Sequence, residues 1–138
     1  MVAEPLVVEV HIEAPPEIVF DCFCDPDALV TWMGDWASVD ARPSGLFAVD
    51  IDDMAVRGEF QVVERPRRLV FSWGFAGSDV PPGTSTVEVT FVEQQGGTQL
   101  TLVHRDLPES EVSRHAVGWN QSLPLLATRA QLGQTRFI

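Results

Sequence analysis

The sequence contains no lysine and no tyrosine among its 138 residues. Without lysine there is no Schiff base and no lysine general base, and without tyrosine there is no phenol to act as an acid or oxyanion donor. The three histidines, His11, His104 and His115, are therefore the only side chains that titrate near neutral pH without help from their surroundings.

Positive charge is also scarce, since nine arginines face 20 acidic residues and the formal net charge is −11. Nucleic acids and anionic membranes both require a basic surface, so neither is an expected partner. No apolar run approaches the roughly 18 residues of a membrane span, and the N-terminus lacks the pattern of a signal peptide. We therefore predict a cytoplasmic protein, and arginine without lysine suggests a GC-rich bacterial genome.

Only two cysteines are present, Cys22 and Cys24, separated by one residue. A disulfide between them would close a very small loop with poor geometry. Zinc would need at least two further ligands, and no Cys/His cluster follows. We therefore expect two reduced thiols, with no metal and no cofactor.

Apolar residues make up 45% of the chain and alternate with polar ones over several segments, which is typical of half-buried strands. The pattern predicts six strands, over residues 6–13, 45–52, 56–64, 68–75, 85–93 and 98–105. Two short helices are predicted over 17–24 and 27–33, and 36–44 is predicted to be a loop. A long helix is expected from about Pro108 to a stop at Gly133, with a kink at Pro124. One α+β domain, residues 1–138, is predicted, with a curved antiparallel sheet around the C-terminal helix.

The predicted inward faces carry unusually many large rings. Phe60, Phe71 and Trp73 fall on the inward faces of strands, while Trp32 and Trp119 fall on helices. Such residues usually form a filled core. The alternative is an apolar ligand cavity, of about 300–1,000 Å³, shared by Trp32, Phe71, Trp73, His104 and Trp119.

His104 follows Leu100 and Leu102 on an inward face, where a histidine must be hydrogen-bonded or uncharged. His115 lies one helical turn before Trp119. Either His104 is a satisfied core residue or the two histidines meet across the cavity as an acid–base pair. His11 is expected to be solvated. The carboxylates expected nearest the aromatic cluster, Asp35, Asp40 and Glu59, are more simply explained as surface residues.

Six segments in order resemble one protein family: residues 14–20 (APPEIVF), 32–34 (WMG), 40–45 (DARPSG), 58–60 (GEF), 66–73 (PRRLVFSW) and 115–119 (HAVGW). It is the branch of the START-like (SRPBCC) superfamily named after the C-terminal domain of the heat-shock protein 90 ATPase activator. The resemblance implies the helix-grip fold, with two short helices after the first strand and a cavity between sheet and long helix. Pro124 departs from the family pattern.

Three functions remain open at this point. The first is binding of a small hydrophobic or amphipathic ligand. Its candidate cavity residues are Trp32, Phe60, Phe71, Trp73, His104, His115, Trp119 and Leu123. The second is an enzyme of the polyketide cyclase/dehydratase type, as in the wider superfamily, with His104 as acid–base; however, known catalytic signatures are absent. The third is co-chaperone-like interaction with a heat-shock protein 90 homologue. A homodimer is a further open alternative.

Overall fold

The structure, a computed structural model, describes the backbone of residues 4–135 and the side chains of residues 4–132. Its elements, in chain order, are β1 (Leu6–Ile12), α1 (Pro16–Cys24), α2 (Pro26–Trp32), β2 (Trp36–Val39), β3 (Leu46–Ile51), β4 (Met54–Glu64), β5 (Arg68–Trp73), β6 (Ser85–Gln94), β7 (Gly97–Arg105) and α3 (Glu109–Thr135).

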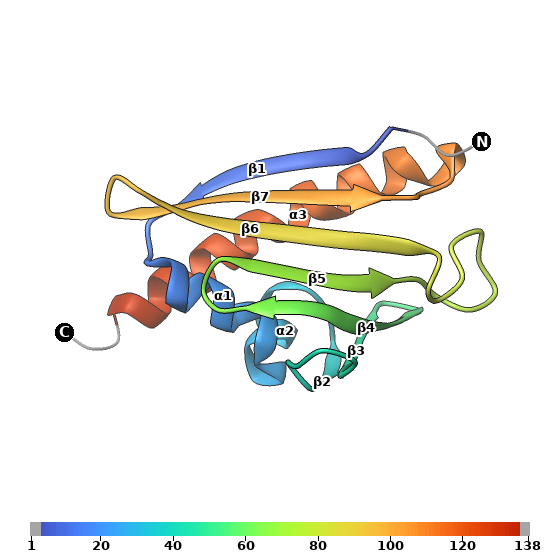
Figure 1. Cartoon of the computed structure of the whole chain (residues 1–138), viewed down its shortest axis with the longest axis horizontal. Helices are drawn as coiled ribbons and strands as arrows, with labels where there is room; N and C mark the ends of the chain where they lie inside the picture. The colour runs from blue at the N-terminus through green and yellow to red at the C-terminus, as the bar shows by residue number, and fades with distance from the viewer. Residues whose placement is uncertain (1–3, 136–138) are drawn as a thin grey trace.

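The strands form one antiparallel sheet in the order β1-β7-β6-β5-β4-β3-β2. The long helix α3 lies across one face of this curved sheet, and α1 and α2 pack beside its C-terminal half (Figure 1). Apolar side chains from both layers meet between them, which explains why the sheet residues alternate between buried and exposed. The predicted α+β helix-grip architecture is confirmed.

The sheet has seven strands, so the prediction of six was wrong by one. Residues predicted as a loop form β2, which pairs with β3 from Trp36 opposite Asp50 to Val39 opposite Phe47. Their sequence shows no alternation, because β2 is a four-residue edge strand whose Trp36 is exposed and whose other residues are half-buried. Pairing with β3 makes this segment a strand, and local sequence does not reveal such a partner.

Local signals set the two short helices. Pro16 occupies the first turn of α1, where its missing N–H costs nothing. Asp25 caps α2 by accepting a hydrogen bond from the Asp27 N–H at 3.0 Å. Gly34 then lets the end of α2 press against β3, because a Cβ there would lie 2.4 Å from the Asp50 carbonyl oxygen. This close approach brings α2 next to the β3–β4 turn.

In α3, the predicted apolar stripe faces the sheet. Trp119, Leu123, Leu126 and Ala130 are buried, with Val112 and Ala116 half-buried. The prediction that Gly133 stops the helix was wrong, since α3 continues to Thr135. A glycine ends a helix only where it takes a left-handed conformation. Pro124 lies inside α3 on its exposed side, and the kink expected there stays a prediction.

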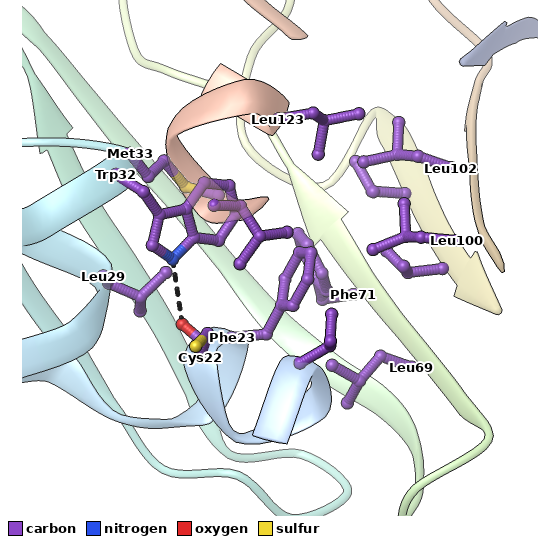
Figure 2. Packing of buried hydrophobic residues seen from close by; sticks show 14 of the residues in the cluster. Cys22, Phe23, Leu29, Trp32, Met33, Leu69, Phe71, Leu100, Leu102 and Leu123 are labelled. Atoms are coloured by element: carbon purple, nitrogen blue, oxygen red, sulfur yellow. Dashed lines mark hydrogen bonds between the residues drawn. The ribbon is translucent and has the colours of Figure 1, made fainter. Parts of the chain in front are cut away.

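The core fills the space between the sheet, α1, α2 and α3. Figure 2 shows Trp32 beside Phe23, with Phe71 and Leu123 nearby, and the Trp32 indole N–H donating to the Cys22 carbonyl at 3.0 Å. In β4 the register shifts between Phe60 and Val62, so Val63 packs against the core where alternation predicted Val62.

Candidate functional site

The predicted cavity residues divide into two groups, and one group is simply core. Trp32, Phe60, Phe71 and Leu123 are buried and packed among other apolar side chains. Phe71, for instance, stacks on Phe47 with ring centroids 4.2 Å apart. Of the five residues predicted to share one space, Phe71 and His104 do not line the cavity that contains Trp73 and Trp119, whereas Trp32 borders the hollow that adjoins it. The sequence pattern allowed either a filled core or a cavity around these residues, and packing among neighbouring aromatic rings fills that region.

A smaller cavity, of about 160 Å³, lies at one end of the sheet beside α3. Three of the predicted residues, Trp73, His115 and Trp119, line it. The remaining lining residues are Met33, Ile51, Met54, Phe75, Glu111, Arg114, Gly118 and Ser122. Its volume falls below the expected range. Most of its wall is aromatic or thioether side chain, which suits an apolar molecule.

Each wall of the cavity has a structural origin. Trp73 ends β5, and an isolated bridge from Val56 to Phe75 holds the chain beyond it against β4. Ile51 and Met54 flank the β3–β4 turn, and Met33 follows α2. The last wall is α3, where residues spaced by three and four share one face.

Two buried histidines connect α3 to the sheet behind this cavity. The Trp119 indole N–H donates to Nδ1 of His104 at 3.1 Å, and His104 Nε2 lies 3.0 Å from the Ser85 hydroxyl. The Trp73 indole N–H donates to Nε2 of His115 at 3.2 Å. The two imidazole centroids are 5.1 Å apart, so the histidines are neighbours, but they do not face each other across the cavity. Only His115 of the pair lines the cavity.

The hydrogen bonds define the protonation of both rings. His104 accepts at Nδ1, so its proton is on Nε2, where it can donate to Ser85; the Ser85 hydroxyl donates to the Trp73 carbonyl at 2.6 Å. His115 accepts at Nε2 and carries its proton on Nδ1, 2.9 Å from the Glu111 carbonyl. Burial, and secondarily the neighbouring His115, lower the pKa of His104 to about 3. His104 is thus a neutral, fully bonded core residue.

Glu111 brings a carboxylate to the cavity wall. Its side chain is only 7% exposed, the Arg114 guanidinium lies 3.4 Å from it, and His115 Nδ1 lies 3.7 Å from it. Glu111 was not among the site residues predicted from the sequence. The sequence did contain a signal for its position: Glu111 precedes His115 by four residues and Trp119 by eight, and residues at this spacing share one helix face.

A second, shallower hollow of about 320 Å³ adjoins the cavity between α2 and α3. The two spaces share Met33, Ile51, Gly118 and Ser122 as lining residues. Gly118 stands at their junction. Apart from its own helix backbone and chain neighbours, no described atom lies within 4 Å of the position that a Cβ would take. The two hollows therefore form a continuous groove along α3.

The other candidates from the sequence lie elsewhere. His11 is exposed and 3.0 Å from Glu13, as expected. Asp35, Asp40 and Glu59 are exposed, and only Asp35 borders the second hollow.

Cys22 and Cys24 are free thiols, and burial is the main cause that raises their pKa values to about 11 and 12. Among residues 4–135 there is no metal-binding cluster, and no helix is long and apolar enough to cross a membrane.

Comparison with known proteins places the chain in a family. The profile described as "Activator of Hsp90 ATPase homolog 1-like protein" (AHSA1) matches residues 13–131. The chain belongs to the AHSA1 family. The resemblance seen in the sequence is thereby confirmed.

Members of the AHSA1 family and related structures agree with the fold. The human "Activator of 90 kDa heat shock protein ATPase homolog 1" is 27% identical over 107 residues, which are 77% of this chain and 30% of the human protein. The chain thus spans less than a third of that protein. An AHSA1-like protein from Rhizobium etli is 41% identical, with a TM-score of 0.71 over 92% of this chain and 82% of its own. CalU16 from Micromonospora echinospora is 27% identical, with a TM-score of 0.77 over 96% and 79%.

Proposed function

We propose that this AHSA1-family chain binds a small amphipathic ligand in the groove between α3 and the β3–β4 turn. The observation that carries the proposal is the cavity beside Trp73 and Trp119, with aromatic and methionine walls and a few polar groups at one side. Such a combination suits a ligand with an apolar body and one polar end.

Gly118 supports the proposal independently of the cavity. A glycine inside a helix costs about 1 kcal/mol relative to alanine. At most glycines in this fold a close backbone approach or a left-handed conformation explains the choice, but Gly118 has open space around it and lies in regular helix. Its missing side chain keeps the groove open between the two hollows.

A pair of substitutions at Gly118 tests the proposal. Gly118→Trp should fill the groove and weaken binding of a neutral probe, 2-naphthylmethanol, at least tenfold in a titration followed by tryptophan fluorescence. Gly118→Ala is the matched control. It should bind as the original chain does and unfold at higher denaturant, with a gain of about 0.5–1 kcal/mol.

Folding of both variants is checked by circular dichroism. Unchanged affinity in a folded Gly118→Trp protein would rule out this groove as the binding site. Native mass spectrometry of the purified chain gives a second readout, since a co-purifying small molecule should be present in the original chain and absent from Gly118→Trp.

The polyketide cyclase/dehydratase alternative depends on His104 as acid–base. Three observations disfavour that role: His104 is 1% exposed, both its ring nitrogens are bonded, and its pKa of about 3 leaves it neutral above strongly acidic pH. A general base needs reach to its substrate and a pKa near the working pH. Binding is therefore the better-supported function.

A co-chaperone-like role is the second candidate. The observation that favours it is the 27% identity to the human heat-shock ATPase activator over 107 residues. Its test is the ATPase rate of a purified bacterial Hsp90 homologue with and without this chain. Under this hypothesis the rate rises in proportion to the chain that is bound, and Gly118→Trp leaves the effect intact.

A further inference from the structure

We infer that the groove selects a ligand with an aliphatic ammonium group, and that Glu111 is the residue that recognises it. This inference rests on the proposed function and adds the chemical class of the ligand. It follows from a count of which polar groups at the cavity remain available to a ligand.

Most polar groups around the cavity are already engaged. The indole N–H groups of Trp73 and Trp119 donate to the two histidines. His115 uses both ring nitrogens, one for Trp73 and one for the Glu111 carbonyl. These residues therefore offer a ligand only apolar and π surface. What remains is the Glu111 carboxylate, the Arg114 guanidinium and the Ser122 hydroxyl.

The Glu111 carboxylate is buried with few partners. The Arg114 nitrogen at 3.4 Å makes a long hydrogen bond, and the His115 nitrogen at 3.7 Å is beyond hydrogen-bond distance. No main-chain N–H of the described residues donates to this carboxylate. A cation placed in the cavity would give this carboxylate a further charged partner.

The position of Glu111 at the start of α3 does not by itself explain its burial. The first turn of a helix favours any negative charge, and Glu109 gains the same benefit. Glu109, however, is exposed, whereas Glu111 is buried and lines the cavity. Glu109 therefore serves as a control for the effect of charge alone.

Arg114 is the weaker candidate for recognition. Its side chain is 73% exposed, so water screens its charge and it can move away from Glu111 when a ligand enters. The adjoining hollow is bordered by two more carboxylates, Asp35 and Asp52, and the whole chain carries −11. This field attracts cations and repels anions. The aromatic rings of Trp73, Phe75 and Trp119 add surfaces that favour an organic cation.

Three probes that share one ring system test the inference: 2-naphthylmethylamine, 2-naphthylmethanol and 2-naphthoate. Each is titrated into the chain at pH 7 and followed by calorimetry. We expect the amine to bind about tenfold more tightly than the alcohol, because a hydrogen bond between charged groups is stronger than a neutral one. The carboxylate probe should bind most weakly.

Two substitutions assign the preference to Glu111. Glu111→Gln should bring the affinity for the amine down to that for the alcohol and leave the alcohol unchanged, whereas the control Glu109→Gln should alter neither. Arg114→Gln should raise the affinity for the amine severalfold, because it removes the competing cation. This variant alters an exposed residue, so it remains informative if Glu111→Gln does not fold.

The outcomes separate this inference from the proposed function. If none of the three probes binds, the groove is not a ligand site and both ideas fail. If the alcohol binds but the amine binds no better, or the carboxylate binds best, the selection of a cation is wrong while ligand binding stands. Loss of amine affinity on Arg114→Gln would equally overturn the inference.

Discussion

A histidine that accepts a hydrogen bond at one ring nitrogen and donates at the other cannot be protonated without losing a bond. For His104 the lost bond would be the one from Trp119, since a second N–H would then face the indole N–H. For His115 it would be the one from Trp73. The network therefore stabilises the neutral form of His104, and the bond from Trp119 ties α3 to the sheet only in that form.

This arrangement predicts a dependence of stability on pH. Because the pKa of His104 is lowered to about 3 in the folded chain, the unfolded chain binds the proton first as pH falls below about 6.5. The stabilisation of the folded chain by neutral His104 is complete above pH 6.5 and is lost progressively as the pH approaches 3. The free energy of unfolding, measured in urea, should therefore fall by on the order of 3 kcal/mol between pH 7 and pH 4.

Two variants control this measurement. His104→Gln keeps an acceptor and a donor but cannot titrate, so its stability should change less over the same pH range. His11→Gln alters an exposed histidine and should retain the full dependence. Equal pH profiles for the original chain and His104→Gln would contradict the assignment.

The cysteines give a second prediction at this scale. Because burial raises their pKa values to about 11 and 12, Cys22 and Cys24 are protonated at neutral pH and should react slowly. A thiol reagent at pH 7.5 should modify the folded chain slowly and should titrate two thiols per chain in 6 M urea. Fewer than two in urea, from protein purified promptly without reductant, would argue against the predicted reduced pair.

The sequence indicated part of the site. Trp73, His115 and Trp119 were predicted from alternation and helical spacing, and they do line the cavity. Met54 could not be found in this way, because it is the first residue of β4 and lies just before the strand that the alternation predicted. Phe75 does continue the alternation of Phe71 and Trp73, although β5 ends at Trp73. The partners of His104 were equally hidden, since Ser85 and Trp119 are brought to it by the register of β6 with β7 and by the docking of α3.

At the scale of the elements, α3 combines a buried stripe with a proline on its outer side. Helices around a core curve with their convex side toward solvent, where main-chain hydrogen bonds lengthen. Pro124 is exposed, while Leu123 and Leu126 on either side are buried. A missing N–H is therefore placed where its loss costs least.

We predict that Pro124→Ala leaves the free energy of unfolding unchanged or raises it. Alanine restores the hydrogen bond to the Asn120 carbonyl and is the best helix former, whereas an interior proline costs about 3 kcal/mol where nothing accommodates it. Gln121→Ala, also on the exposed side, controls for general effects of substitution in α3. A loss above about 1 kcal/mol would show that packing requires the bend.

The elements also show which structural signals are local. The helix α1 begins at Pro16, and α2 begins at Pro26 after the capping residue Asp25; both signals are visible in the sequence. The strand β2 has no such signal, because its four residues gain strand character from pairing with β3. The bulge in β4 is similar: it transfers the core position from Val62 to Val63 for a reason that lies in the pairing with β5.

At the scale of the whole molecule, the excess of acidic residues is the dominant electrostatic feature. Ion pairs such as Arg42–Asp40 and Arg65–Asp21 are well exposed, so each contributes little to stability. The net charge of −11 acts over longer distances and opposes the compact state. The order of the elements other than β2, and the family, followed from the sequence, whereas the cytoplasmic location and the homodimer stay predictions.

Salt should therefore stabilise this chain. Raising NaCl from roughly 0.05 M to 0.5 M shortens the screening length several-fold and weakens the repulsion among carboxylates. We expect the melting temperature to rise by a few degrees. The same concentration of KCl should raise it by a similar amount. A fall in melting temperature would mean that the ion pairs outweigh the net charge.

The tautomers of the two buried histidines also have a spectroscopic consequence. The proton on Nε2 of His104 is held in a buried hydrogen bond, and the proton on Nδ1 of His115 is held in a partly buried one. Imidazole protons of exposed histidines exchange with water too fast to be seen, as those of His11 should. A proton NMR spectrum in water at pH 7 should therefore contain two downfield imidazole signals, one correlated with Nε2 and one with Nδ1, and both should vanish when the helix α3 detaches from the sheet.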